Sequence, residues 1–150
     1  PAVNDKMKRI LFVCTGNTCR SPMAEIILKA KLKEANVKNV RVSSAGLMAE
    51  EGHKISKNSA AALKLMGLKS YSFKAKPLTE DMIEKSDLVI CMTEKHKECL
   101  KGFNHVCSAK EIIGSDVSDP YGQDIKTYIE TSLQIEKLCD TITERIVKFL

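Results

Sequence analysis

Aromatic residues are scarce in this chain, which has no tryptophan, three tyrosines and four phenylalanines, or 5% of 150 residues. Proteins that bind single-stranded nucleic acids stack bases on such side chains. The net charge of +5 comes from lysines scattered along the chain rather than gathered in one block. A charge of this kind mildly favours anionic substrates, and we expect no nucleic-acid partner.

Long apolar runs are also lacking, since none exceeds the five residues of 10–14 and 88–92. A membrane-spanning helix needs about 20 such residues, so we expect no membrane span. The first residues, PAVNDKMKR, are polar and do not resemble a secretory signal. The six cysteines lack the regular spacing of a disulfide framework. We therefore expect a protein of the reducing cytoplasm.

Internal repeats, low-complexity tracts and linkers are absent as well, and 43% of the residues are hydrophobic. A chain of this length buries roughly 70% of its unfolded surface in one core. We therefore predict a single domain over 1–150 and expect a monomer. Apolar runs alternate with segments of helical periodicity, which is typical of an α/β fold with a parallel sheet and helices on both faces. The expected strands are 10–14, 40–43, 87–92 and 106–107, and the expected helices are 23–35, 58–66, one beginning at 79, 93–101 and 125–149.

The stretch 10–25, ILFVCTGNTCRSPMAE, is the most informative part of the sequence. Its pattern predicts a buried strand that ends at Cys14, a tight loop, and a helix that Ser21 could cap, with Pro22 in the first turn. Such a turn directs successive backbone N–H groups into one concavity at the positive end of a helix dipole. The stretch therefore predicts an anion site of phosphate size.

Reactive side chains stand at both ends of this loop. A helix N-terminus and a nearby cation favour the thiolate form of a cysteine, and the thiolate is its nucleophilic form. Arg20 offers a planar fork that matches two phosphate oxygens. A phosphoryl group held there would lie over Cys14, which could attack it and form a phosphocysteine. The plainer alternative is a buried structural cysteine beside a surface arginine.

A proton donor for the leaving group is the other requirement of such a reaction. Asp119 lies in the sequence SDPYG, where Pro120 favours an extended backbone and Gly122 permits a turn. A carboxyl group on a loop over the phosphate could protonate the leaving atom and later activate water. The alternative is an ordinary aspartate of a turn.

Five motifs, taken together and in order, resemble the low-molecular-weight protein tyrosine phosphatase family; they are CTGNTCRSPMAE at 14–25, SSAG at 43–46, PLTEDM at 77–82, SDLVICMT at 86–93 and DPYG at 119–122. The resemblance implies a four-stranded parallel sheet with helices on both faces. It also implies that Cys14 is the nucleophile, that Arg20 clamps the phosphate, and that Asp119 acts first as acid and then as base.

The same resemblance implies further roles around the loop. Asn17 and Ser21 would hold the loop open and stabilise the thiolate, and Ser44 would brace it. Cys19 would form a reversible disulfide with Cys14 that shields the nucleophile from further oxidation. No metal or cofactor is implied, because the arginine and the amides supply the charge stabilisation. Phosphorylated proteins are the implied substrates, and the residues expected to contact them are Thr15, Gly16, Asn17, Thr18, Cys19, Ser21, Leu47 and Tyr121.

The choice of phosphorylated side chain is a finer expectation. A branch of the family that acts on phosphoarginine in proteins carries threonine where tyrosine-selective members often have a larger aliphatic residue, and Thr18 occupies this position. Leu47 is not aromatic, which weakens a sandwich around phosphotyrosine, whereas Tyr121 suits one. We therefore favour phosphoarginine, with phosphotyrosine as the alternative.

Three other classes of protein fit the sequence less well. A thiol-dependent arsenate reductase would need two relay cysteines, for which Cys91 and Cys99 are available, but the relay pair is expected to begin near Thr93, and Cys91 lies in an apolar run. A module that only binds phosphate would lack Cys14 or Asp119, and both are present. A zinc site is disfavoured by the irregular spacing of its candidate ligands Cys91, His96, Cys99 and Cys107. His53, His96 and His105 are interpreted as loop or surface residues.

Overall fold

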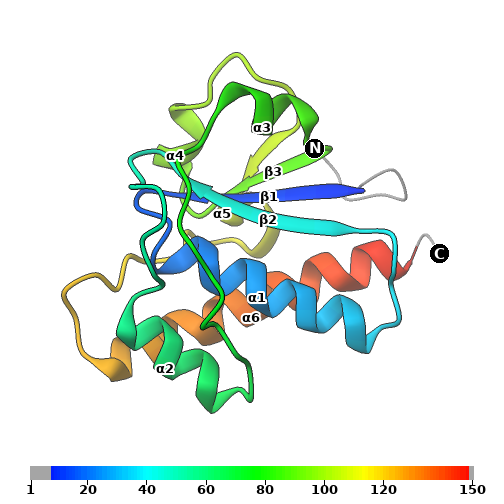
Figure 1. The fold of residues 1–150 in the computed structure, drawn as a ribbon. Helices are drawn as coiled ribbons and strands as arrows, with labels where there is room; N and C mark the ends of the chain where they lie inside the picture. The colour runs from blue at the N-terminus through cyan, green and yellow to red at the C-terminus, as the bar shows by residue number, and fades with distance from the viewer. Residues whose placement is uncertain (1–7, 149–150) are drawn as a thin grey trace.

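The computed structural model describes residues 8–148. Four strands form one parallel sheet in the order β2-β1-β3-β4 (Figure 1). This arrangement confirms the predicted α/β fold with a four-stranded parallel sheet. The strands are β1 Arg9–Cys14, β2 Arg41–Gly46, β3 Leu88–Cys91 and β4 Val106–Ser108.

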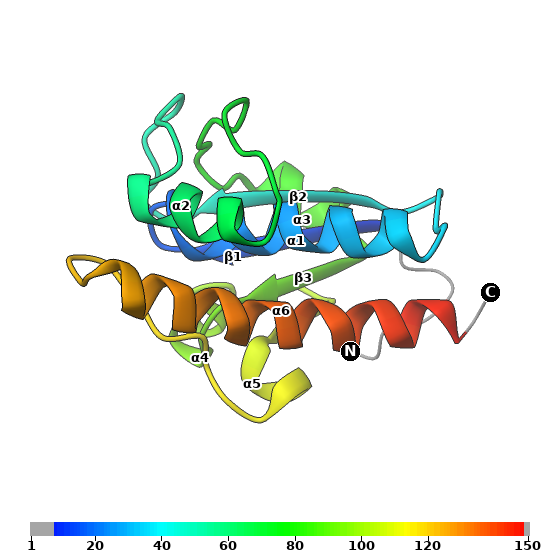
Figure 2. The same ribbon diagram turned by 90° about the horizontal axis from the view of Figure 1, so that it is seen from below.

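Helices cover both faces of the sheet. The helices α1, α2 and α6 lie on one face, and α6 also contacts α5 (Figures 1 and 2). The short helices α3 and α4 lie on the other face. The bounds are α1 Arg20–Glu34, α2 Lys57–Leu65, α3 Glu80–Lys85, α4 Glu94–Glu98, α5 Ala109–Ile113 and α6 Ile125–Val147. No helix within residues 8–148 is both long and apolar enough to cross a membrane.

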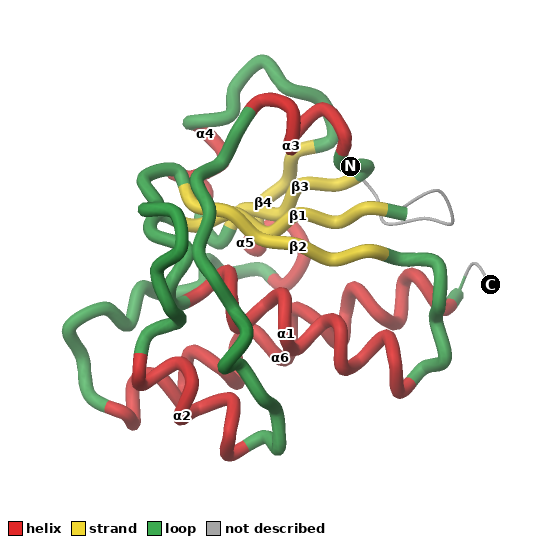
Figure 3. The backbone as a smooth tube through the Cα atoms, in the orientation of Figure 1, coloured by secondary structure: helices red, strands yellow, loops and turns green. Residues whose placement is uncertain are grey.

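Strand β1 is the centre of the core. Its side chains alternate, so that Ile10 and Phe12 pack in the larger cluster beneath α1 and α6, while Leu11 and Val13 pack in the smaller cluster beneath α3 and α4. All four are buried, which explains why the run is continuously apolar rather than alternating. The loops after the strands gather at one end of the sheet (Figure 3). In parallel sheets this carboxyl end is where ligands bind.

Several predicted boundaries differ from the structure. Helix α1 begins at Arg20 rather than residue 23, so Ser21 lies inside the helix, and the residue at the cap position makes no side-chain cap. Strand β2 continues to Gly46, and α4 ends at Glu98. Helix α5 was not predicted, since its five residues are too few to show a period. The predicted end of the last helix at Phe149 lies outside the described residues.

Candidate active site

The loop 15–19 joins β1 to α1 and is held against the end of β2. The backbone N–H of Leu47 donates to the Cys14 carbonyl at 3.0 Å, and that of Met48 donates to the Thr15 carbonyl at 2.8 Å. A Cβ atom at Gly46 would lie 2.6 Å from the Thr15 carbonyl oxygen and 2.8 Å from the backbone nitrogen of Asn17. Gly46 is therefore needed because only a residue without a side chain lets the loop approach so closely.

Cys14 lies buried at the start of this loop, and its Sγ is 2.8 Å from the Ser21 hydroxyl. The Asn17 amide nitrogen donates to that same hydroxyl oxygen at 2.9 Å. The Ser21 oxygen accepts from Asn17, and its own hydrogen can be donated to the sulfur when Cys14 is a thiolate. A hydrogen bond donated to a thiolate stabilises the charged form. Ser21, which was expected to cap the helix, instead contacts the sulfur.

A chain of hydrogen bonds fixes Asn17 in turn. Its amide nitrogen also donates to Ser44 at 2.9 Å, Ser44 donates to the Glu25 carboxylate at 2.7 Å, and its amide oxygen accepts from the Lys76 backbone N–H at 3.0 Å. Asn17 has φ of 55°, a left-handed conformation that asparagine tolerates better than most residues. Asn17 and Ser44 are fully buried. These contacts leave the Asn17 side chain a single orientation and thereby fix the direction of the bond to Ser21.

Arg20, the first residue of α1, is 5% exposed and faces the loop that carries Asp119. Its Nη1 donates to the Val117 carbonyl at 3.1 Å, and its Nη2 lies 3.6 Å from Asp119 Oδ2. The Asp119 side chain is 54% exposed and accepts a hydrogen bond from the Tyr121 backbone N–H. The structure thus brings Arg20 and Asp119, two of the three side chains predicted to do the chemistry, close to each other, while Cys14 lies at the other end of the loop that precedes Arg20.

The loop that carries Asp119 is tied to the rest of the fold at several points. The Val117 backbone N–H donates to the Met92 carbonyl at 2.9 Å, just past β3. From α6, the Gln134 side chain accepts from the Ser118 N–H and donates to the Asp116 carbonyl at 2.8 Å. Gln134 could not be recognised from the sequence, because a glutamine inside a helix carries no signal of its contact with a loop.

His96 corrects the interpretation of the histidines. It is buried rather than a surface residue, its Nε2 lies 2.9 Å from the Thr15 hydroxyl, and its Nδ1 lies 3.0 Å from Thr93. Burial first, and then the positive charge of Arg20, lower the pKa of His96 to about 4, although Asp119 and Asp116 act in the opposite direction. His96 is therefore a neutral side chain that ties α4 to the loop. His96 follows the third strand closely, and the carboxyl ends of parallel strands lie together, so its position could have indicated a contact with the loop after the first strand.

The low pKa of His96 predicts a pH-dependent stability. The folded protein holds the ring neutral, whereas the unfolded chain takes up a proton below about pH 6.5. The neutral ring of His96 therefore leaves the free energy of unfolding at its full value above about pH 6.5, and this free energy decreases as the pH falls toward 4. Between pH 7 and pH 4.5, the free energy of unfolding should decrease less in His96→Gln than in the wild type, by on the order of 2 kcal/mol. Urea unfolding at pH 7 and pH 4.5 measures this difference. The exposed His53→Gln is the matched control, and an equal acid loss in both variants would contradict the assignment.

The remaining predicted residues of the loop differ in their exposure to solvent. Thr18 is half-buried, and the Cys19 sulfur lies 3.4 Å from the Ser56 hydroxyl and 3.6 Å from that of Tyr128. Burial and this contact with Cys19 raise the pKa of Tyr128 to about 12, so the phenol stays protonated. Thr15 is exposed and Gly16 is half-buried, and Gly16 could accept a Cβ without a close contact.

Leu47 and Tyr121 lie in contrasting environments. Leu47 is half-buried and packs on the smaller core cluster, whereas Tyr121 is 77% exposed on the loop after Asp119. Only Tyr121 therefore presents most of its side chain to solvent. The role of either residue in substrate binding remains a prediction.

Of the other cysteines, Cys91, Cys107 and Cys139 are buried in the core, whereas Cys99 is exposed. Cys91 is fully buried inside β3, where burial raises the pKa of its thiol, so the interpretation of Cys91 as a core residue is confirmed. A relay thiol must reach an external reductant, which Cys91 does not. Within residues 8–148, no group of three His, Cys, Asp or Glu side chains is placed to hold a metal ion, so Cys91, His96, Cys99 and Cys107 form no zinc site.

A model of the low molecular weight phosphotyrosine protein phosphatase family matches residues 9–149. The chain belongs to this family. It is therefore a hydrolase of the low-molecular-weight protein phosphatases, and the resemblance drawn from the motifs is confirmed. Phosphoproteins are the substrates of such enzymes, in agreement with the partner that the sequence predicted.

Relatives within the family carry two kinds of name. The chain is 39% identical to the protein-arginine-phosphatase of Bacillus subtilis, over 93% of this chain and 97% of that protein. It is 34% identical to the low molecular weight protein-tyrosine-phosphatase PtpB of Staphylococcus epidermidis, over 89% and 96%. Among solved structures, a mutant YwlE arginine phosphatase with a phosphorylated active-site serine superposes with a TM-score of 0.86 at 36% identity, over 92% of this chain and 95% of that one.

Proposed function

We propose that this phosphatase removes phosphoryl groups from phosphoarginine side chains of proteins through a phosphocysteine formed at Cys14. The observation that carries the proposal is the chain of hydrogen bonds that ends at the sulfur. Asn17 donates to Ser21, and Ser21 can donate to Cys14 when the sulfur is a thiolate. A buried sulfur with such a partner, in a loop that leads to a buried arginine, is suited to act as an anion under a bound phosphate.

In the first step the Cys14 thiolate attacks phosphorus while the bond from phosphorus to the leaving nitrogen breaks. Arg20 and the backbone N–H groups of the loop hold the equatorial oxygens of the phosphoryl group. Guanidine is a strong base and a poor leaving group unless its nitrogen receives a proton. Asp119, which stands 3.6 Å from Arg20, gives that proton to the leaving nitrogen.

In the second step a water molecule attacks phosphorus and the sulfur–phosphorus bond breaks. The Asp119 carboxylate takes a proton from this water, and the products are inorganic phosphate and the Cys14 thiolate. The proton that Asp119 gives in the first step is thus regained in the second. Ser21 stabilises the thiolate as the leaving group by the same hydrogen bond that favours it as the nucleophile.

The preference for phosphoarginine depends on Thr18. Its hydroxyl lies 3.9 Å from the neighbouring Cys19 sulfur, a long contact, and its side chain is half-buried. A polar, small side chain at the rim of the loop suits a guanidinium better than a flat phenyl ring. Two relatives named protein-arginine-phosphatase, at 39% and 33% identity, support this choice, while relatives at 34% and 36% are named for tyrosine.

Kinetics on paired peptides test the preference. We expect a higher kcat/KM for a phosphoarginine peptide than for the phosphotyrosine peptide of the same flanking sequence. In Thr18→Ile this ratio should fall by about tenfold, because the hydroxyl is replaced by a methyl-bearing side chain of larger volume. The ratio does not depend on how much of each variant is folded. A ratio unchanged by the substitution would remove Thr18 from the account, and a wild-type preference for phosphotyrosine would favour the alternative substrate.

A further inference from the structure

Most of the segment between β2 and α3, from residue 52 onward, contains an unusual share of the positive charge of the chain. Residues 52–79 contain six lysines and no aspartate or glutamate. The rest of the chain has 18 lysines and arginines against 19 acidic residues, so this segment accounts for the whole net positive charge. The six are Lys54, Lys57, Lys64, Lys69, Lys74 and Lys76, and all but Lys76 are exposed.

These lysines are not neutralised locally. Within residues 8–148, none of the six forms an ion pair with a carboxylate, whereas Lys29, Lys85 and Lys97 each form one and Lys31 forms two. A cluster of unpaired like charges is repulsive within the folded protein. It is therefore unfavourable for the isolated protein and is relieved when an anionic group binds.

An apolar pocket opens among the same lysines. It has a volume of about 420 Å³, and Ile55, Leu68, Tyr71 and Phe73 line it. Lys54, Lys64 and Lys69 stand around it. The ring of Tyr71 is 86% exposed. A large exposed aromatic side chain next to an apolar pocket is typical of surfaces that bind proteins or peptides.

The pocket is connected to the catalytic loop through short contacts. The Ser56 backbone N–H, next to Ile55 in the pocket wall, donates to the Thr18 carbonyl at 2.8 Å. At the other end of the segment, the Lys76 backbone N–H donates to Asn17 at 3.0 Å. A peptide whose phosphorylated residue enters the loop could therefore extend its flanking residues into the pocket.

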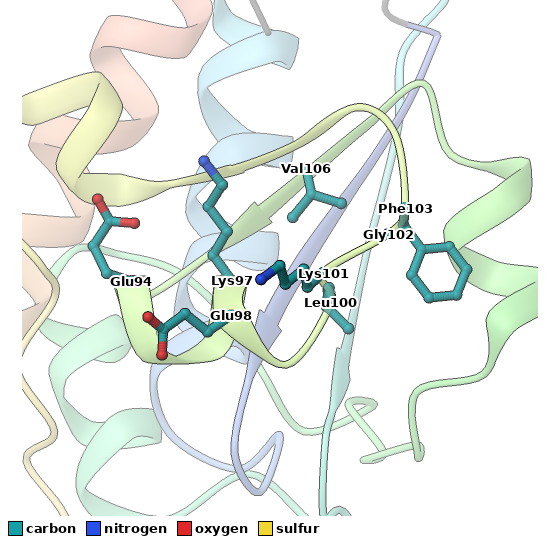
Figure 4. A pocket seen from close by; sticks show the side chains of 8 residues that line it. All are labelled: Glu94, Lys97, Glu98, Leu100, Lys101, Gly102, Phe103 and Val106. Carbon is teal, nitrogen blue, oxygen red and sulfur yellow. The ribbon is translucent and has the colours of Figure 1, made fainter.

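A larger pocket elsewhere on the surface does not share these properties. It measures about 530 Å³ and lies around the end of α4 and the loop before β4 (Figure 4). Glu94 and Glu98 stand beside its two lysines, Lys97 and Lys101, so its charges balance. Lys97 is also paired with Glu111. That pocket therefore does not select for a ligand by charge.

We propose that the pocket of Ile55, Leu68, Tyr71 and Phe73, with its surrounding lysines, binds an acidic segment of the phosphoprotein substrate. The segment would place one apolar side chain in the pocket and its carboxylates against the lysines. This inference concerns substrate choice and rests on the phosphatase function proposed above. It assigns to the enzyme a preference for phosphorylated residues that are flanked by Asp or Glu together with an apolar residue.

Charge-reversal variants test the proposal. The variant is Lys54→Glu with Lys64→Glu and Lys69→Glu, and the matched control reverses three exposed lysines away from the segment, Lys33, Lys38 and Lys148. Substrates are p-nitrophenyl phosphate and phosphorylated peptides with either an acidic, leucine-containing flank or a neutral flank, on either side of the phosphorylated residue. Wild type should prefer one acidic-flanked peptide by about tenfold in kcat/KM, mainly through KM.

The outcomes separate docking from catalysis. The first variant should lose the preference for the acidic flank and keep its rate on p-nitrophenyl phosphate, while the control variant keeps both. Equal effects of the two variants, or no flank preference in wild type, would overturn the proposal. Binding of wild type to phosphatidylserine vesicles but not to an unphosphorylated acidic peptide would overturn it too. If no variant hydrolyses any substrate, the proposed function fails, and titration with that peptide still tests the pocket.

Discussion

Replacing Cys14 by serine is expected to lower kcat by about 10⁴-fold or more on every phosphorylated substrate. A thiolate is a strong nucleophile, whereas a serine hydroxyl stays protonated at neutral pH and attacks phosphorus poorly. Ser21 would then face another hydroxyl in place of the sulfur. Because serine has the same shape as cysteine and is slightly smaller, the fold should be retained. Steady-state kinetics with p-nitrophenyl phosphate and with phosphorylated peptides measure the loss.

The matched control is Cys99→Ser, which makes the same chemical change at an exposed cysteine of this chain. Its turnover should equal that of the wild type within about twofold, as is usual for a surface substitution. Substantial turnover in folded Cys14→Ser would mean that another side chain attacks the phosphorus. That result would reject the proposed role of Cys14 whatever the substrate.

Replacing Arg20 by lysine is expected to lower kcat/KM by about 10³-fold, although the charge is kept. Arg20 has two tasks in this proposal: it binds the phosphate, and its Nη1 holds the Val117 carbonyl at 3.1 Å. Its Nη2 also lies near Asp119. A single ammonium group cannot bind two phosphate oxygens in one plane and hold the acid-bearing loop as well. The loss should therefore appear in both KM and kcat.

Inhibition by inorganic phosphate separates the two functions of Arg20. In Arg20→Lys the inhibition constant should rise, which reports weaker anion binding independently of the chemical step. Arg41→Lys, at an exposed position on β2, makes the same change and should leave both constants unaltered. If Arg20→Lys kept the wild-type inhibition constant and turnover, the guanidinium would not be the phosphate clamp.

The strand, loop and helix around Cys14 could be predicted because their signals are local. A buried apolar run, a sudden polar loop and a helix start follow one another within sixteen residues, 10–25. The positions of Cys14 and Arg20 at the two ends of that loop then define the chemistry. Asp119 needed the Asp-Pro pattern and the family resemblance as well, because its approach to Arg20 spans 99 positions of the chain.

The contacts that support the site could not be predicted, because they join residues that carry no local signal. His96 reaches Thr15 across 81 positions, and Gln134 holds the loop of Asp119 from inside a long helix. Ser21 illustrates a different limit. Serine next to a helix start is a common cap, and only the position of the Cys14 sulfur shows that its hydroxyl points elsewhere.

Helix α5 shows how short elements are missed. It spans Ala109–Ile113 and is stabilised by the Ser108 side chain, which accepts from the Glu111 backbone N–H at its start. Five residues do not establish a hydrophobic period, so tertiary packing against α6 decides the conformation. Ser108 is a possible helix cap in the sequence, but one capping residue does not indicate a helix of five residues without the contact with α6.

The central claim is that phosphorus becomes attached to the sulfur of Cys14. Asp119→Ala should slow hydrolysis of the intermediate, because no carboxylate remains to activate water. This variant is mixed with ³²P-labelled p-nitrophenyl phosphate, whose leaving group needs no proton, then quenched within milliseconds, digested and examined by mass spectrometry. We predict one phosphoryl group per chain, attached through the Cys14 sulfur on the peptide that contains it. Label on any other residue, or turnover of bound substrate without label, would contradict it.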